Sequence, residues 1–383
     1  MSSDPLLRWR KEFPTLRDSV HLISHSLGAM PRAAVDRLRE FTDAWRRDSI
    51  EAWHDWLPRV TASGDEIGAL LHAPKGTVTM HQNVSSLMAI VMSSFDFRGP
   101  RRKIVSTDMN FPSVHYVLKE QERLGAKLHL VRSRDRITVE TEEFIRAIDD
   151  RTLAVVVELV LFRSGYIQEA KEIVRAAHRK GALAVLDAYQ AVGAIPVDVA
   201  DLGCDFLMGG SVKWLCGGPG AAYLYARKSV MNRLEPRDCG WFSHKRPFDF
   251  VLDRIDYRND VMRYMGGTPG IPALYSSAAG RQILRAVGIG AVRRKSLRQT
   301  QIAIDLADAR GLRLNTPRDP RRRGNMVCVD FPGAERVHLE LLKRRFLIDY
   351  RPGSGIRLSP HFYTRDDELH ALFTEIDRLR RPL

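Results

Sequence analysis

Short apolar runs alternate with helix-period segments through the middle of this chain. The runs are rich in aliphatic and β-branched residues, as buried strands are: "KIVSTDM" (103–109), "KLHLV" (127–131), "LAVVVELV" (153–160), "ALAVLDA" (182–188), "FLMGG" (206–210) and "AAYLYA" (221–226). Two of the intervening segments have helical spacing and end at Gly125 and Gly181, where a left-handed C-cap is expected. Repetition of strand and helix predicts an α/β fold with a mostly parallel sheet covered on both faces.

The length of 383 residues and the 44% hydrophobic content allow a large core and more than one structural unit. A long helical stretch covers residues 281–311, and the runs "MVCVDF" and "LIDYR" that follow it resemble strands of a smaller layer. We therefore predict three parts: an N-terminal arm with helices (1–65), a large domain (66–275) and a small C-terminal α+β domain (276–383).

The charge balance is basic, because 60 Lys and Arg residues face 46 Asp and Glu residues, for a net charge of +14. The basic runs are short, scattered and not interleaved with aromatic residues, which favours a solvated arginine-rich surface over a nucleic-acid partner. No apolar run predicts a membrane span or a signal peptide, so we expect a soluble cytoplasmic protein. Widely spaced cysteines without a C-x-x-C motif predict neither a disulfide framework nor a metal site. The cysteines are Cys204, Cys216, Cys239 and Cys328.

Polar residues follow three of the predicted strands, and in open α/β sheets ligands bind beyond these carboxyl ends. Asp187 ends one strand, Ser164 follows another, and Lys213 follows "FLMGG". A buried aspartate needs a cationic partner, and a protonated pyridine nitrogen is one such partner. A lysine in a desolvated pocket has a lowered pKa, which suits it to form a Schiff base with an aldehyde cofactor. Each signal alone also fits a structural residue; their combination favours a cofactor site.

The segment "TMHQNVSSLMAIVMSSF" supplies a seat for a phosphate. Residues 83–86 open an apolar helix with side chains that cap helix N-termini. Free backbone N–H groups and the helix dipole at such a start favour a bound dianion. The chain thus offers groups for a ring nitrogen, an aldehyde and a phosphate.

Several sequence blocks, taken in order, resemble the class V aminotransferase superfamily of pyridoxal-phosphate enzymes with fold type I, and within it the kynureninases. The blocks are "HSLGAMPR", "NVS", "NFPSVHY", "RSG", "LDAYQAVGAIPVDV", "GGSVKWLCGGPG", "GWFSHKRPF", "GGTPGIPAL", "NTPRDPRRRG" and "GIRLSPHFYT". Together they cover nearly the whole chain. The resemblance implies pyridoxal 5'-phosphate as the cofactor.

The resemblance also implies roles for individual positions. Lys213 resembles the Schiff-base lysine and Asp187 the partner of the pyridinium nitrogen, which together make the electron sink. The other implied cofactor contacts are Val84 and Ser85 at the phosphate, Phe111 stacked on the ring, Ser164 beside it, Gln190 near the phenolic oxygen, Trp241 at the border of the site, and Thr268 reaching the phosphate from a second subunit.

Substrate contacts and the assembly follow from the same resemblance. Arg357 resembles the arginine that binds the substrate α-carboxylate, a task that suits the guanidinium fork. Trp241 and His25 match positions that border the substrate. Family members are homodimers with shared active sites, so a homodimer that acts on a small-molecule amino-acid substrate is implied. Trp241 as a core aromatic, Arg357 as a surface arginine and Ser164 as a turn residue remain open alternatives.

The reaction itself is left open by the residues. Kynureninase-like hydrolytic cleavage of a Cβ–Cγ bond is the first expectation, and transamination or β-elimination is the alternative. Val212 and Val114 stand where the kynureninases carry tyrosine and aspartate, His25 stands for asparagine, and Gln190 for histidine. A desulfurase needs a mobile cysteine, whereas Cys328 lies in an apparent strand. Retention of Lys213 and Asp187 favours an enzyme over a related fold used only for binding.

Overall fold

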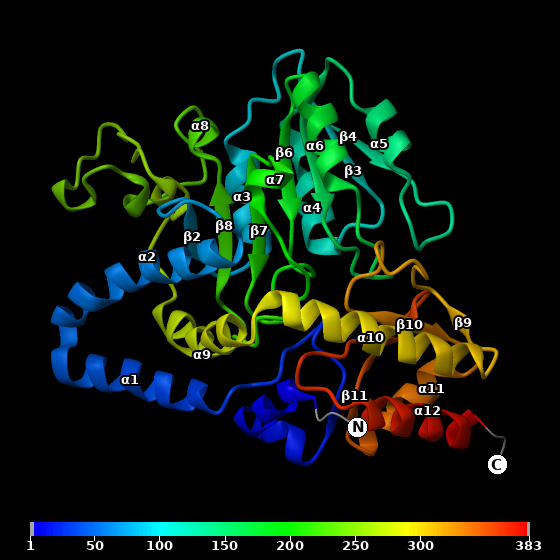
Figure 1. Ribbon diagram of the computed structural model, residues 1–383. Helices are drawn as coiled ribbons and strands as arrows, with labels where there is room; N and C mark the ends of the chain where they lie inside the picture. The colour runs from blue at the N-terminus through cyan, green and yellow to red at the C-terminus, as the bar shows by residue number, and fades with distance from the viewer. Residues whose placement is uncertain (1–3, 381–383) are drawn as a thin grey trace.

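A seven-stranded sheet forms the centre of the molecule in the computed structural model, which describes residues 4–380 (Figure 1). Its strand order is β2-β8-β7-β6-β5-β3-β4, and the five strands from β7 to β4 run parallel. β8 pairs antiparallel with both β7 and β2. The strands are β2 (Val78–His81), β3 (Lys103–Thr107), β4 (Lys127–Val131), β5 (Thr152–Glu158), β6 (Leu183–Asp187), β7 (Phe206–Gly210) and β8 (Ala222–Ala226). The predicted mostly parallel sheet is confirmed, and β2 is the one strand of this sheet that the sequence did not reveal.

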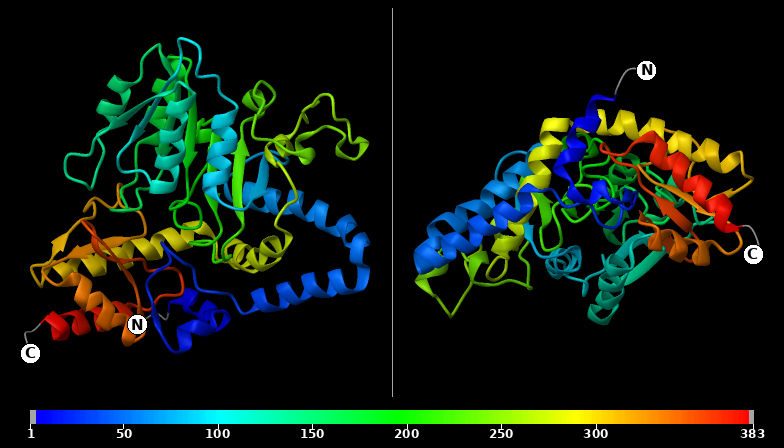
Figure 2. Two further views of the ribbon diagram at one scale, coloured as in Figure 1. Left: turned by 180° about the vertical axis from the view of Figure 1, so that it is seen from behind. Right: turned by 90° about the horizontal axis from the view of Figure 1, so that it is seen from below.

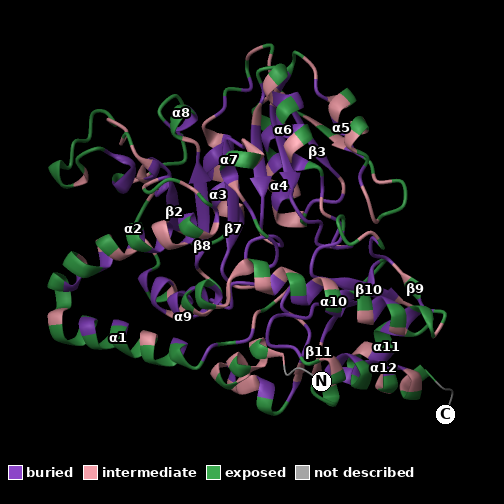
Figure 3. Cartoon of the chain, in the orientation of Figure 1, coloured by how far each residue is buried: buried purple, intermediate pink, exposed green. Residues whose placement is uncertain are grey.

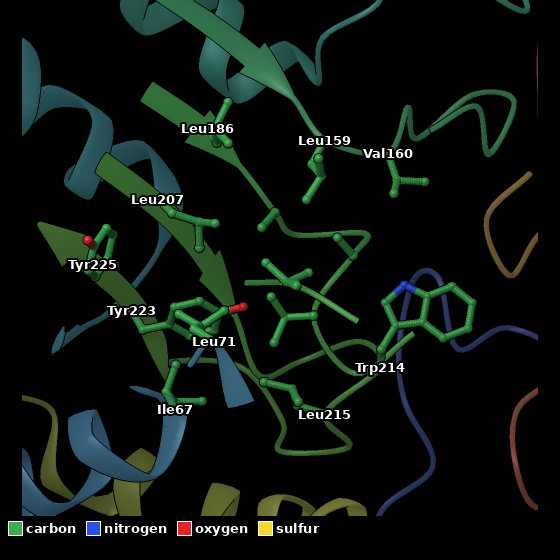
Figure 4. Close-up of a cluster of buried hydrophobic side chains, with 14 of the residues drawn as sticks. Ile67, Leu71, Leu159, Val160, Leu186, Leu207, Trp214, Leu215, Tyr223 and Tyr225 are labelled. Carbon is green, nitrogen blue, oxygen red and sulfur yellow. The ribbon is translucent and has the colours of Figure 1, made fainter. Parts of the chain in front are cut away.

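Alternate residues of each central strand face two different apolar clusters, which explains why the strands are apolar throughout. In β5, Val155 and Val157 belong to one cluster, whereas Ala154 and Val156 belong to the other. Figure 3 shows the central strands as buried, and Figure 4 shows side chains of β6, β7 and β8 in the same apolar cluster as Ile67. Both faces are covered by helices, as expected for parallel strands.

The helices on one face are α3 (Val84–Ser93) and α4 (Pro112–Glu120). Those that contribute to the other cluster are α1 (Ala33–Asp48), α2 (Trp53–Leu70), α5 (Thr141–Ala147), α6 (Ala170–Arg179), the short α7 (Val199–Leu202), α9 (Ile271–Val287) and, through Val292, α10 (Ile289–Asp308). The short α8 (Lys228–Met231) follows β8. Gly125 and Gly181 have φ of 100° and 65°, so the predicted left-handed glycines after α4 and α6 are confirmed.

A smaller antiparallel sheet, in the order β12-β13-β10-β9, packs with the C-terminal helices. Its strands are β9 (Arg313–Leu314), β10 (Val327–Asp330), β12 (Asp349–Arg351) and β13 (Gly355–Leu358), and the helices are α10 (Ile289–Asp308), α11 (Ala334–Lys343) and α12 (Asp366–Arg380). The N-terminal arm lies against this unit (Figure 2), because β1 (Val20–His21) pairs parallel with β11 (Phe346–Leu347). Arg10 and Glu368 add an ion pair of 2.8 Å.

The domain boundaries expected near residues 65 and 275 fall inside α2 and α9. The helical stretch that we expected at 281–311 is two helices, since Gly288 with a φ of 81° separates α9 from α10. The division into three parts stays a prediction. Among residues 4–380, no helix combines the length and apolar character needed to cross a membrane.

Gly28 joins the N-terminal arm to the turn after β7. Its N–H donates to the Val212 carbonyl at 2.9 Å. A Cβ atom at this position would lie 2.1 Å from the backbone oxygen of Lys213, a contact that only a backbone shift could relieve. The arm therefore braces the turn that carries Lys213.

We expect Gly28→Ala to lower the free energy of unfolding by about 1–3 kcal/mol, because the added methyl group overpacks a backbone contact. Gly290→Ala is the matched control: its Cβ would meet only Arg294 at an ordinary 3.5 Å, within helix α10. That change should be neutral or stabilising by up to about 1 kcal/mol. Urea denaturation of both variants measures the difference, and equal stabilities would contradict the bracing role.

Candidate active site

A cavity of about 240 Å³ lies where β5, β6 and β7 end and α3 begins. It brings together five of the residues predicted from the sequence with five others. Its lining is Asn83, Val84, Ser85, Phe111, Ser113, Glu158, Asp187, Tyr189, Val212 and Lys213. The carboxyl ends of parallel strands are where ligands bind in such sheets, so the location agrees with the expectation from topology.

Lys213 occupies the turn after β7 and points its amine between aromatic rings. Its Nζ lies 4.5 Å from the ring centroid of Tyr189 and 5.4 Å from that of Phe111. Burial lowers the pKa of Lys213 to about 8, although the carboxyl groups of Glu158 and Asp187 oppose the shift. A large fraction of this amine is therefore neutral, and nucleophilic, near pH 8.

Asp187 is the last residue of β6 and is only 2% exposed. One carboxylate oxygen accepts the backbone N–H of Tyr189 at 2.8 Å. Burial raises the pKa of Asp187 to about 6, and the hydrogen bond from Tyr189 and the charge of Lys213 limit the rise. Above that pH the protein holds a poorly solvated negative charge, which a cationic ring nitrogen would stabilise.

The first turn of α3 lines another part of the cavity. Asp187 carries a negative charge, whereas this part of the cavity favours a bound anion. The Asn83 side chain caps the helix by accepting the N–H of Ser86 at 2.9 Å. The next two residues, Val84 and Ser85, line the cavity. N–H groups in the first turn of a helix have no partner within the helix, so this end favours an anion such as a phosphate.

His25 and Arg357 lie in a buried network outside the cavity lining. Arg357 donates to both oxygens of Asp349 at 2.8 and 2.5 Å and to the Phe162 carbonyl at 2.6 Å. His25 contacts Asp349 at 2.9 Å and Ser359 at 2.7 Å, and burial lowers the pKa of His25 to about 4. Asp349 thus neutralises the arginine expected to bind a substrate carboxylate, which leaves that role a prediction.

Gln190 and Ser164 also lie outside the lining. The Gln190 amide accepts the indole N–H of Trp214 at 2.9 Å and donates to the His25 carbonyl at 3.0 Å. The Ser164 hydroxyl donates to the Ile137 carbonyl at 2.7 Å, in keeping with the turn-residue alternative. Their expected contacts with a cofactor remain predictions.

The chain between α8 and α9 extends to the left in Figure 1, and both Trp241 and Thr268, which belong to this segment, are exposed. Trp241, in the 3-10 helix Trp241–Ser243, stacks on Phe250 with ring centroids 6.1 Å apart. Neither residue lines the cavity of its own chain. The expected cofactor contacts of Trp241 and Thr268, that of Thr268 from a second subunit, remain predictions.

Sequence reasoning missed two residues of the cavity, Tyr189 and Glu158. Glu158 ends β5, is 1% exposed, and pairs in register with Asp187 on β6. Burial and then the charge of Asp187 raise its pKa well above the ordinary value. A carboxylate that ends an apolar strand is the same signal that identified Asp187, so the sequence contained the information needed to find it.

The residues of the cavity fit pyridoxal 5'-phosphate. An amine with a lowered pKa suits the aldehyde, a buried carboxylate suits the ring nitrogen, and a capped helix start suits the phosphate. Moreover, Oε2 of Glu158 is buried without a hydrogen-bond partner, which points to a polar group that the cavity receives from a ligand.

We expect Asp187→Asn to stabilise the cofactor-free protein at pH 8 by about 3 kcal/mol, because it removes a buried charge. A carboxyl group whose pKa is raised on folding contributes stability below its unfolded pKa near 4, and this contribution is lost as pH rises through about 6. The advantage of the variant should therefore vanish near pH 4. Urea denaturation between pH 4 and 8 measures it.

Asp205→Asn is the matched control, since Asp205 is equally buried but fully partnered. It accepts the Ala184 N–H at 2.8 Å and pairs with Arg227 and His178. Its replacement should destabilise the protein at pH 8. A loss of stability at pH 8 in Asp187→Asn as well would show that Asp187 is not an unsatisfied charge.

Comparisons with known proteins identify the family of this chain. The family model described as aminotransferase class-V matches residues 28–356. An uncharacterized aminotransferase, YcbU, from Bacillus subtilis (strain 168) is 30% identical over 96% of this chain and 96% of its own. A kynureninase from Pseudomonas fluorescens is 29% identical over 98% of this chain and 91% of its own.

Solved structures share the fold at lower identity. The apo cysteine desulfurase from Thermococcus onnurineus NA1 superposes with a TM-score of 0.88 at 21% identity, over 97% of both chains. The cystine C–S lyase C-DES, in complex with its product cysteine persulfide, has a TM-score of 0.86 at 17% identity, over 95% of this chain and 98% of its own. A further C-DES structure holds glycine covalently linked to its pyridoxal-phosphate cofactor. This chain belongs to the class V aminotransferase family, and its cofactor is pyridoxal 5'-phosphate.

Proposed function

We propose that this protein is a pyridoxal-phosphate enzyme that acts on an α-amino acid, with hydrolytic Cβ–Cγ cleavage of a kynurenine-type substrate as its first candidate reaction. The observation that carries the proposal is the juxtaposition of Lys213 and Asp187 in one cavity beside a capped helix start. Kynureninases from several bacteria, at 28–29% identity over 93–98% of this chain, support the choice of reaction.

The bound cofactor would supply an electron sink for negative charge at the α-carbon of the amino acid. Lys213 would hold the cofactor aldehyde through its amine and, once replaced there by the substrate amine, take the proton from the α-carbon at Nζ. Asp187 would keep the ring nitrogen protonated, and the start of α3 would hold the phosphate. Phe111 and Tyr189 would exclude water from the surroundings of Nζ.

One observation favours a second candidate, transamination or β-elimination. Val212 lines the cavity directly before Lys213, and an aliphatic side chain cannot donate a proton to a leaving carbon. Both alternative reactions can proceed with Lys213 as the proton carrier. A protein-cysteine mechanism has less support, because among residues 4–380 three cysteines are buried, Cys239 is exposed, and none lines the cavity.

The active form that we propose is a homodimer with shared sites. Between α8 and α9, six large apolar side chains are exposed, and Leu252 is 97% exposed. The six are Trp241, Phe248, Phe250, Val251, Leu252 and Ile255. Trp241 packs against both Phe248 and Phe250, and exposed apolar side chains gathered in this way support an interaction surface. Thr268, which follows closely and is also exposed, is the residue that would reach the phosphate of the second subunit.

The decisive assay incubates purified holoprotein with L-kynurenine, 3-hydroxykynurenine and a panel of amino acids, with and without a keto-acid acceptor, and identifies the products by mass. We expect release of anthranilate or its hydroxy derivative. Keto-acid-dependent products would support transamination instead, and products formed by loss of a β-substituent would support β-elimination. No conversion of any amino acid by cofactor-loaded protein would contradict the enzymatic function.

Lys213→Arg should abolish the visible absorption band of the bound cofactor and lower turnover by about 10²- to 10⁴-fold or more, because a guanidinium group cannot form the imine or carry the proton. Lys295→Arg is the matched control: this lysine is buried too, but it donates to the Phe362 carbonyl at 2.7 Å and pairs with Asp4, away from the cavity. It should keep both band and turnover. A visible band that survives in Lys213→Arg would refute the cofactor assignment.

The shared site predicts complementation between inactive subunits. Mixing Lys213→Ala with Thr268→Ala subunits should restore part of the activity, because one site of each hybrid dimer receives both intact residues. Subunit exchange is verified by native mass spectrometry. If exchange occurs and activity does not return, Thr268 does not act across the interface.

A further inference from the structure

Glu158 is the polar group in the cavity to which the proposed function gives no task. It lines the cavity, is 1% exposed, and its Oε2 has no hydrogen-bond partner. The rest of the residue is well fixed: its N–H donates to the Asn110 side chain at 3.2 Å, and its carbonyl accepts from Gln168 at 2.5 Å. A rigid strand end thus holds a carboxyl group with one unsatisfied oxygen in the site, and such a buried oxygen is costly without a partner.

The order of the strands indicates which part of the cofactor faces Glu158. On the pyridine ring the aldehyde carbon lies between the carbon that bears the phosphate arm and the carbon that bears the 3-hydroxyl group. Helix α3, the phosphate seat, packs against β7 and β8. β5 lies on the other side of β6. With the ring nitrogen at Asp187 and the aldehyde at Lys213, the hydroxyl edge therefore faces β5 and its last residue.

Glu158 is suited to be a donor at that edge. Burial and the charge of Asp187 raise its pKa, and these effects outweigh the opposing contributions of Lys213, the Phe162 N–H and Arg357. The neutral acid has one O–H donor. Gln190 is the residue expected near the phenolic oxygen. Its amide oxygen already accepts a hydrogen bond from Trp214, and its amide nitrogen donates one to the His25 carbonyl.

We propose that Glu158 acts as a neutral carboxylic acid that donates a hydrogen bond to the 3-oxygen of bound pyridoxal phosphate. This inference rests on the proposed attachment of the cofactor to Lys213. This hydrogen bond would give Oε2 of Glu158 a partner. Through Glu158, its last residue, β5 would directly influence the electronic state of the cofactor ring. The strand ends then contribute a donor from β5 and an acceptor from β6 to two different edges of one ring.

The test is the pH titration of the visible band in the cofactor-loaded protein. The band reports the protonation of the nitrogen that links the cofactor to the lysine, and this proton is shared with the 3-oxygen. A hydrogen bond donated to the 3-oxygen lowers the affinity of that oxygen for the shared proton. Glu158→Met removes the donor at similar size, so the midpoint should rise by about one pH unit or more. Glu158→Gln keeps an N–H donor and should stay within about 0.3 units of wild type.

The charge state of Glu158 decides whether the midpoint of the pH titration rises or falls in the variants. An ionised Glu158 would stabilise the protonated nitrogen, so its loss would lower the midpoint in both variants, and that result would overturn the proposal. Gln168→Met is the matched control, since Gln168 is buried, bonds to the same strand end and does not line the cavity. An equal rise in Gln168→Met, or no rise in Glu158→Met, would also overturn it.

An infrared difference spectrum keeps the proposal testable if Glu158→Met does not fold. The wild type should show the stretching band of a protonated carboxyl group that shifts when pyridoxal phosphate binds and that is missing in Glu158→Gln. Absence of that band contradicts the proposal. A wild-type protein that forms no visible band with pyridoxal phosphate would instead refute the proposed function, on which this inference depends.

Discussion

The desolvation of Lys213 and Asp187 in one cavity is the constraint on which the site depends. Burial alone makes the amine less basic and the carboxyl less acidic, while their attraction works in the opposite direction. The result is an amine that is partly neutral near pH 8 and a carboxylate for which the cationic ring of the cofactor is the proposed partner. The poor solvation that makes these groups reactive also lowers the folding stability of the protein in the absence of the cofactor.

The architecture keeps that charge in place. β5, β6 and β7 are buried on both faces, so their ends are rigid platforms for Glu158, Asp187 and Lys213. The N-terminal arm supports the turn after β7 through Gly28, and the same arm pairs with β11 in a separate two-stranded sheet. The arm therefore links the turn that carries Lys213 to a part of the chain that is far away in sequence.

Much of the fold and the centre of the site could be predicted from the sequence, because both follow local patterns. Apolar runs gave six strands of the main sheet within two residues of their observed bounds, and the cap-type residues at Asn83 identified the start of α3. The pairing of Asp349 with Arg357 was not foreseen, because Arg357 lies on β13, a strand that the sequence analysis did not identify, directly opposite Asp349 on β12. The hydrogen bonds that occupy Gln190 depend on Trp214 and the arm in the same way. Glu158 was missed although it carried a readable signal.

The proposed function depends on covalent attachment of the cofactor to Lys213. Reduction of the holoprotein with borohydride fixes the cofactor on whichever lysine holds it, and peptide mapping by mass spectrometry then identifies that lysine. We expect a single pyridoxyl-phosphate adduct in the peptide that contains Lys213. An adduct on another lysine, or no adduct on protein that has taken up the cofactor, would contradict it.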